Sequence, residues 1–363
     1  MGGGGRRTVR VAPVTTPAPP SLSLIARRVD ERVAALLTAE RARWTAVSAD
    51  LAEPFEALTA LVRGGGKRLR PAFCHWAFVG AGGDPDDPRA VDAGAALELL
   101  HTFALIHDDI MDNSSTRRAM TTVHVRFEER HALDGWRGEG RRFGEGVGVL
   151  VGDLAFVYAD LLLAGAPREA MAVFTELRIE VNVGQYLDLV GTARGTVDEQ
   201  QARRISLFKS GKYTVERPLH LGAALAGRLD ALAGPLSAFG LPLGEAFQLR
   251  DDLLGAFGDE TLTGKPVGED IREGKPTLLY AAARSRLGDG EPLLDRYGAA
   301  DLSDDEMADL QDLLVETGAV AQVEATIDYR VAEALHHLDH APLVPEARTA
   351  LAHLARFVAG RDR

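Results

Sequence analysis

The sequence has little of what several protein classes require. Its 363 residues include one cysteine, Cys74, which excludes an intramolecular disulfide and a multi-cysteine zinc site. We expect Cys74 to be a small core residue and the chain to work in a reducing, cytoplasmic compartment. Long apolar runs are also missing. The longest charge-free candidate, 231–244, has 14 residues and contains two prolines, so it is too short for a transmembrane segment.

Basic residues are outnumbered by acidic ones. The chain has 41 Lys and Arg against 53 Asp and Glu, a formal net charge of −12. This balance argues against a protein whose main partner is nucleic acid. Hydrophobic residues make up 46% and charged residues 26%, which is typical of a soluble globular protein and excludes wholesale disorder.

The first twenty residues differ in composition from the rest. They contain four consecutive glycines, three arginines and four prolines, and no apolar segment of a signal peptide follows the arginines. We expect residues 1–20 to be a disordered leader and residues 21–363 to form one large helical domain. Length alone, at about 150 residues per domain, would also allow two domains.

Apolar residues recur at steps of three and four from residue 21 on, as at Leu24, Ile25, Val29 and Val33. Pro88 stands where the first turn of a helix over 89–112 would begin. No period-two run and no Asn-Gly turn indicates strands. The sequence therefore predicts an all-α protein of ten or more helices. Other segments with a helical period are 150–165, 168–190, 198–232, 237–254, 275–287, 304–316 and 318–338, and the expected loops are 64–66, 82–88 and 135–148.

Three aspartates close the helix predicted over 89–112. At about 100° per residue, Asp108 and Asp112 lie one turn apart on one face, with Asp109 beside them. Carboxylates this close repel one another, so a positive group should lie among them. Oxygen ligands suit Mg²⁺, which binds to one or two carboxylates together with substrate phosphates. The alternative for this triplet alone is a solvated acidic helix end.

A second acidic pair, Asp251 and Asp252, ends another apolar helical stretch and is followed by Lys265, Asp270 and Lys275. Two carboxylate clusters can face each other across a helical bundle and hold several Mg²⁺ ions between them. This arrangement suits chemistry that ionises a diphosphate leaving group, because the metals stabilise the developing negative charge.

Basic residues accompany both acidic clusters. The string over 63–71 has Lys67, Arg68 and Arg70 directly after three glycines, which let the backbone approach a ligand closely. It is not a Walker A loop, because it lacks that spacing and a preceding strand. Arg117 and Arg118 follow the first aspartates by five residues. Further lone candidates, each of which could equally be solvated surface, are Lys209, Lys212, Lys265 and Lys275.

Together these segments resemble the trans-polyprenyl diphosphate synthases, the short-chain family that elongates allylic diphosphates with isopentenyl diphosphate. The resemblance runs in the family's order from about residue 60 to residue 280. It is carried by GGGKRLRP, ELLHTFALIHDD, DDIMD, the Arg117-Arg118 pair with Thr121, Thr122 and His124, LVGD, GQYLD, KSGKYT and the second aspartate region. It implies an isoprenoid-synthase helical bundle around a central cavity, a head-to-tail prenyltransferase and a homodimer.

The resemblance also implies a role for each motif residue. Lys67, Arg70, His101 and Arg118 correspond to the metal-free pocket for isopentenyl diphosphate. Asp108 and Asp112 correspond to ligands of two Mg²⁺ ions and Asp251 of a third, with Asp109 and Asp252 supporting them. The allylic diphosphate would be held by Arg117, Lys209, Gln248, Lys265 and Lys275, with Asp270 completing that shell. In the family mechanism, diphosphate ionises from the allylic substrate, the isopentenyl double bond attacks the cation, and the departing diphosphate takes the proton. The catalytic set is therefore Asp108, Asp109, Asp112, Asp251, Asp252 and Lys209.

Several of these residues have a simpler structural interpretation. A buried histidine such as His101 is often a satisfied core residue, and we expect His107 and His124 to be structural. We expect Gln185 and Asp188 to make helix-to-helix hydrogen bonds near the site. Two departures from the family pattern stand out: Gly255 replaces the third aspartate that many members carry, and Ser210 replaces the more usual threonine. We expect no loss of activity from either.

Product length is predicted from the residues before the first aspartates. In this family the hydrocarbon chain of the product grows along the helix face below the first aspartates. Ala104 lies within about 40° of Asp108 on an ideal helix, whereas Phe103 points about 140° away. Geometry alone therefore does not bring Phe103 to that hydrocarbon chain. The resemblance supplies that step: an aromatic residue here, a small one next, and no insertion in the aspartate motif resemble geranylgeranyl diphosphate (C20) synthases. Farnesyl diphosphate (C15) is the alternative product, with C25 behind it. The alternative classes are a class I terpene cyclase and the non-catalytic subunit of a heteromeric synthase.

Overall fold

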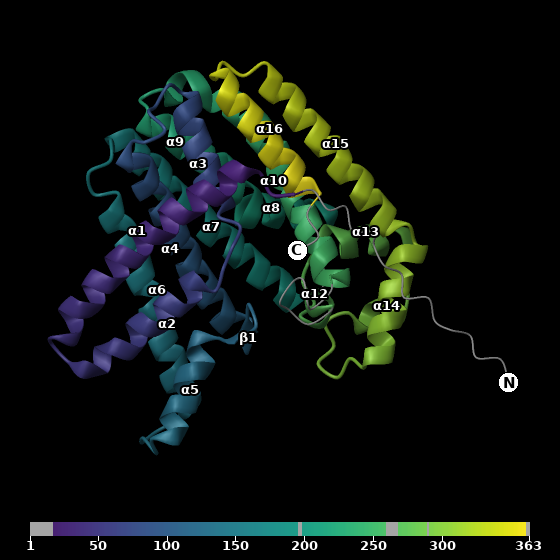
Figure 1. Ribbon diagram of the computed structural model, residues 1–363. Helices are drawn as coiled ribbons and strands as arrows, with labels where there is room; N and C mark the ends of the chain where they lie inside the picture. The colour runs from purple at the N-terminus through teal and green to yellow at the C-terminus, as the bar shows by residue number, and fades with distance from the viewer. Residues whose placement is uncertain (1–16, 195–197, 259–267, 289, 361–363) are drawn as a thin grey trace.

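The computed structural model describes residues 17–194, 198–258, 268–288 and 290–360, and its chain is helical along most of that length (Figure 1). The predicted all-α fold is confirmed. The expected leader falls largely on residues 1–16, which lie outside the described residues, as does Lys265. The principal helices are α1 (Pro20–Thr45), α2 (Ala52–Arg63), α3 (Leu69–Gly80), α4 (Pro88–Met111), α5 (Val123–Leu133), α6 (Gly140–Leu162), α7 (Arg168–Arg194), α8 (Glu199–Ser206), α9 (Arg217–Leu225), α10 (Leu229–Phe257), α12 (Glu269–Arg272), α13 (Leu278–Leu287), α14 (Asp304–Glu316), α15 (Ala319–Asp339) and α16 (Pro345–Ala359).

Helix α4 carries the first aspartates at its C-terminal end. It begins at Pro88, as predicted, and the Asp87 side chain accepts a hydrogen bond from the Arg89 backbone N–H. Its first half is rich in buried alanine and glycine, which lets neighbouring helices approach closely. A methyl group at Gly94, for example, would lie 2.8 Å from the Val29 side chain. Helices α3 and α6 pack against α4 and hold the aspartate end in place.

A second group of helices carries the other half of the site. Helix α10 packs along α15. Helices α15 and α16 lie side by side, drawn in yellow-green and yellow in Figure 1. Helices α3 and α9 connect this group to α4. The buried apolar side chains of both groups form one continuous cluster. In the described part of the chain, no helix is long and apolar enough to cross a membrane.

Four segments differ from the sequence prediction, two of them in η2 (Leu207–Glu216) and α10. Residues 207–216 form a π-helix, η2, within the stretch predicted as continuous α-helix over 198–232. Helix α10 runs through Pro235, which lies in the break predicted between 198–232 and 237–254, and through Pro242 within the second of these segments. Each interior proline costs about 3 kcal/mol, and the burial of apolar side chains along α10 offsets that cost.

The other differences lie after the first aspartates. The segment 135–148, expected to be a loop, is helical from Gly140, because its glycines are used for packing: a methyl group at Gly144 would overlap the backbone of α5. A short antiparallel pair, β1 (Thr116–Arg117) and β2 (Met120–Thr121), was not predicted. Strands of two residues are too short to give a period-two signal. Arg118 and Ala119, between them, have positive φ.

Candidate active site

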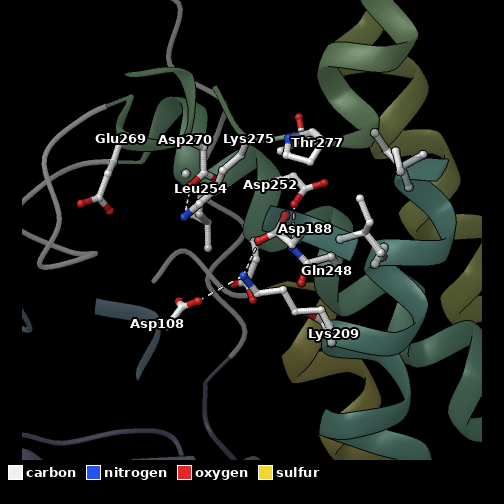
Figure 2. A pocket seen from close by; sticks show the side chains of 18 of the residues that line it. Asp108, Asp188, Lys209, Gln248, Asp252, Leu254, Glu269, Asp270, Lys275 and Thr277 are labelled. Atoms are coloured by element: carbon white, nitrogen blue, oxygen red, sulfur yellow. Dashed lines mark hydrogen bonds and ion pairs between the residues drawn. The ribbon is translucent and has the colours of Figure 1, made fainter. Parts of the chain in front are cut away.

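A cavity of about 340 Å³ lies between the ends of α4, α7 and α10 and the π-helix η2 (Figure 2). Both acidic clusters reach it: Asp108 from α4, and Asp251 and Asp252 from α10. Residues 143 positions apart in the sequence, Asp108 and Asp251, therefore line the same space. The other polar residues that line it are Arg117, Asp188, Ser206, Lys209, Ser210, Gln248, Glu269, Asp270, Lys275 and Thr277.

Lys209 connects three elements on one side of the cavity. Its Nζ lies 2.6 Å from Oδ2 of Asp188 on α7 and 3.3 Å from Oδ1 of Asp108 on α4 (Figure 2). Burial alone would raise the pKa of Asp108, but Lys209, Lys275 and Arg117 together lower it. Gln185, one turn before Asp188, donates to Asp108 Oδ1 at 2.7 Å. Gln185 and Asp188 thus make cross-helix hydrogen bonds near the site.

On the other side, Lys275 connects Asp112 of the first acidic cluster to Asp270 and Glu273. Its Nζ lies 2.6 Å from Glu273 Oε2, 3.3 Å from Asp270 Oδ1 and 3.9 Å from Asp112 Oδ2. Burial opposes the charge of Lys275, but these three carboxylates raise its pKa well above the ordinary value. Burial and the neighbouring Asp108 raise the pKa of Asp112 to about 6. The site therefore brings several carboxylates close together, and the ammonium groups of Lys209 and Lys275 lie among them.

The remaining aspartates of the motifs are held by specific partners. Asp109 is almost fully buried and accepts a hydrogen bond from Arg117 Nε at 2.8 Å. Asp252 is buried and accepts one from Gln248 Nε2 at 2.7 Å. Burial raises the pKa of Asp252 to about 8, and the nearby Asp270 and Asp251 add to the effect. Arg117 and Gln248 therefore fix carboxylates as well as lining the cavity.

The π-helix η2 is held by two glycines on its neighbours. A methyl group at Gly184 of α7 would overlap the backbone of Lys209. A methyl group at Gly244 of α10 would lie 2.6 Å from the backbone of Gly211. The η2 backbone therefore passes in direct contact with both helices, which brings Lys209 to the cavity. Long π-helices are rare and are frequently found at functional sites.

A basic cluster lies beneath the acidic one. The Arg70 guanidinium lies over the Tyr213 ring at 4.2 Å and donates to Thr214 Oγ1 at 2.9 Å. Among the described residues, the buried Nε of Arg70, Nδ1 of His101 and the Tyr213 hydroxyl have no hydrogen-bond partner. Burial, with Arg70 and Arg118 nearby, lowers the pKa of His101 well below its ordinary value. Tyr213 and Thr214 end the KSGKYT motif, and the resemblance implies no role for either.

The glycine-rich loop is fixed by Arg68, which differs in role from its neighbours. Arg68 is buried and donates to Glu98 Oε2 at 2.9 Å, to Asp30 Oδ1 at 2.7 Å and to two backbone carbonyls. Its donors are therefore used within the protein. Lys67 is half-buried beside it, and the Arg118 guanidinium lies against Gly66. Burial, together with Arg68, Arg117 and Arg70, lowers the pKa of Arg118, as expected where positive charge gathers.

Gly255 has a packing role that the sequence did not reveal. A methyl group at this position would overlap the Asp270 carboxylate. Asp270, from α12, therefore occupies the space beside α10 that a side chain at residue 255 would need. The second motif lacks its third aspartate, and Asp270 brings a carboxylate to the same place.

Phe103, on α4, packs against α6. Its ring centroid lies 4.8 Å from that of Phe156 and 4.5 Å from that of His107. Ala104 is half-buried, one turn before Asp108. His107 also approaches the Val149 carbonyl, at 3.2 Å, and His124 is buried.

Comparison with known proteins agrees with this arrangement. The sequence profile of the polyprenyl synthetase family matches residues 52–314. The chain is 36% identical over 292 residues to the geranylgeranyl diphosphate synthase of Mycobacterium tuberculosis, covering 77% of each protein. It is 31% identical over 293 residues to the geranylfarnesyl diphosphate synthase of Aeropyrum pernix, covering 78% of this chain and 86% of that relative.

Solved structures of the same family are also similar to this chain. The crystal structure of geranylgeranyl pyrophosphate synthase from Corynebacterium glutamicum, complexed with isoprenyl diphosphate and magnesium, has a TM-score of 0.88 and 36% identity, with 93% of this chain and 99% of that one covered. The candidate site, with two acidic clusters and a basic pocket, lies in a helical bundle that is similar to that structure. The chain belongs to the polyprenyl synthetase family and is a trans-prenyltransferase.

Proposed function

We propose that this enzyme condenses isopentenyl diphosphate with allylic diphosphates, head to tail, and releases geranylgeranyl diphosphate (C20). The observation that carries the product length is Phe103, five residues before Asp108, with its ring against Phe156 of α6. No residue is inserted between Asp108 and Asp112 to alter the distance. Relatives named as geranylgeranyl diphosphate synthases, from Mycobacterium tuberculosis and Sulfolobus acidocaldarius, support the same length.

The carboxylates fit divalent cations by their chemistry, because all of the donors are oxygen atoms. Asp108, Asp112 and Asp251 would hold about three Mg²⁺ ions, with Asp109 and Asp252 fixed behind them by Arg117 and Gln248. When bound, Mg²⁺ supplies the positive charge that makes diphosphate a good leaving group. Among the described residues, no group of three acidic side chains is yet spaced to hold a metal ion, and Lys209 and Lys275 pair with the carboxylates instead.

The basic residues divide between the two substrates. Lys209 and Lys275 would pair with the allylic diphosphate when metal neutralises their present carboxylate partners, assisted by Arg117, Gln248 and Lys265. Lys67, Arg70, His101 and Arg118 would hold isopentenyl diphosphate. The buried and unpartnered atoms of Arg70 and His101, in the described part of the chain, support an anionic ligand there.

We further propose a homodimer formed through α6 and α7. Each helix exposes apolar side chains along one face, at helical spacing: Leu150, Val157 and Leu161 on α6, and Ile179, Val183 and Tyr186 on α7. An exposed apolar face of this kind is typical of an interaction surface. Replacing both Val157 and Leu161 with Glu should halve the mass measured by light scattering, and an unchanged mass would contradict this interface.

Product analysis tests the proposed reaction. The protein is incubated with Mg²⁺, labelled isopentenyl diphosphate and dimethylallyl, geranyl or farnesyl diphosphate in turn, and the products are dephosphorylated and sized. A dominant C20 alcohol is expected, and EDTA should abolish it while circular dichroism stays unchanged. A C15 or C25 product would retain the enzyme class and contradict the length. No elongation by folded protein would favour a non-catalytic subunit.

A further inference from the structure

An arginine closes the packing below Phe103. The Arg178 guanidinium of α7 lies 5.0 Å from the ring centroid of Phe156 and 4.7 Å from that of Phe174. Its Nη1 also donates to both carboxylate oxygens of Asp160 on α6, at 2.8 and 2.9 Å. Phe103 packs on the same Phe156 ring. These side chains form a continuous contact from α4 through α6 to α7.

The register of the helices gives the depth of this contact. Along α6, a methyl group at Gly148 would meet Ile110, one at Gly152 would meet His107, and Phe156 faces Phe103. Each of these α6 residues lies one helical turn farther from the aspartates than the one before it. Asp160 follows Phe156 by four residues, so it lies one turn, about 6 Å, farther from the aspartates.

Distances along helix α7 give the depth of Arg178 relative to Phe103 independently. Gln185 donates to Asp108 Oδ1 at 2.7 Å, which aligns α7 with α4 at the level of the aspartates. Arg178 is seven residues before Gln185, on the same face and about 10.5 Å along the helix. Phe103 is five residues before Asp108, about 7.5 Å along α4. Arg178 is therefore the deeper of the two.

We propose that Arg178, held by Asp160, is a second stop for the growing hydrocarbon, one level below Phe103. This inference rests on the proposed chain elongation toward Phe103. Phe103 limits the chain by its bulk alone, whereas the Arg178 guanidinium is also held through Nη1 by both oxygens of Asp160, so displacing it would break charge-assisted hydrogen bonds. The Arg178 guanidinium also packs on the Phe156 ring. Removing Arg178 therefore opens the space of its own side chain and leaves the Phe156 ring less constrained.

The test compares single and double variants by product sizing, with farnesyl diphosphate as primer. Phe103→Ala is expected to move the main product from C20 to C25, because Arg178 still limits growth. Adding Arg178→Ala should move products to C30 and longer, raising their share at least fivefold over Phe103→Ala alone. Arg178→Ala alone should leave C20 dominant. Equal distributions for Phe103→Ala and Phe103→Ala/Arg178→Ala would overturn the proposal.

Three further variants in the Phe103→Ala background separate the causes. Asp160→Asn removes the carboxylate charge that holds Arg178 and should lengthen the product in the same direction as Arg178→Ala. Arg178→Met keeps much of the bulk, so a distribution as short as that of Phe103→Ala would overturn the role of the ion pair. Arg194→Ala, an exposed arginine at the other end of α7, is the matched control and should change nothing.

A binding measurement separates this inference from the proposed reaction. Calorimetry of a C30 diphosphate, one unit too long for the Phe103→Ala variant, with Phe103→Ala and with the Phe103→Ala/Arg178→Ala variant needs no turnover. The double variant should bind it at least tenfold more tightly, and equal affinity would overturn the second stop. A wild-type product of C15 would contradict the proposed length alone, because the comparison between the two variants still reports on Arg178. Thermal unfolding of each variant verifies that it is folded.

Discussion

The Asp188 carboxylate holds the Lys209 ammonium at 2.6 Å and so directs it toward Asp108, 3.3 Å away. Lys209 comes from the π-helix η2 and Asp188 from α7, whereas Asp108 ends α4. One lysine therefore joins the three elements that meet at the cavity. A group in this position neutralises the Asp108 and Asp188 carboxylates, and it would lie close to a diphosphate bound at these aspartates.

Removing the Lys209 charge should weaken use of the allylic substrate. We expect Lys209→Met to lower kcat/KM for the allylic diphosphate by about 10- to 100-fold, since a charged hydrogen bond contributes about 1.5–3 kcal/mol. Asp188→Asn, which keeps an acceptor for Lys209, should cost less than tenfold. Steady-state kinetics with varied allylic substrate measures both. An effect below twofold for Lys209→Met would contradict this role.

The contact of Gly184 with η2 predicts a second effect. Gly184→Ala adds a methyl group that overlaps the Lys209 backbone, so η2 must shift away from α7. We expect a loss of about 1–3 kcal/mol in the free energy of unfolding and a larger loss of activity, because Lys209 moves with its backbone. Gly146→Ala is the matched control. It lies in α6 with open space around it and should stabilise the protein by about 0.5–1 kcal/mol.

The buried ion pair of Arg68 and Glu98 predicts a third effect, on stability. Arg68→Met leaves Glu98 buried without this partner and should lower the free energy of unfolding by about 3–5 kcal/mol. Adding Glu98→Gln to Arg68→Met should recover part of that loss, because the unpaired charge is then gone. Denaturant unfolding of the two single variants and the double variant forms the required cycle. Additive losses would show that the pair is not coupled.

Sequence could locate the site because its motifs are local. The spacing of Asp108 and Asp112 is a property of one helix, and Pro88 marks the start of that helix. The family resemblance then assigned roles to Arg117, Lys209 and Lys275 that periodicity alone could not. These residues now lie within reach of the two acidic clusters.

What sequence could not predict depends on contacts between distant segments. The π-helix η2 reflects the approach of Gly184 and Gly244 from two other helices, which no local pattern reports. Glycines over 135–148 indicated a loop, but at Gly144 the missing side chain serves the packing of α6 on α5. The packing role of Gly255 could not be predicted either, because the side chain that occupies the space beside it is that of Asp270, from α12.

Because of its buried histidines, we expect the free energy of unfolding of the protein to depend on pH. His75 is 8% exposed, and burial, with Arg28 nearby, lowers its pKa to about 4 in the folded protein, against about 6.5 when unfolded. Between these values the unfolded chain binds a proton that the folded chain does not. Stability therefore falls as pH drops from about 6.5 to 4, by on the order of 3 kcal/mol for His75 alone.

His75→Gln tests this directly, because glutamine does not titrate. The variant should lose stability at pH 7.5 through altered packing, yet its free energy of unfolding should fall less steeply than that of the wild type between pH 6.5 and 4.5. His124 and His220, whose pKa values are also lowered chiefly by burial, should maintain part of the slope. Parallel pH profiles for the variant and the wild type would mean that His75 takes up its proton equally in both states, which its burial beside Arg28 argues against.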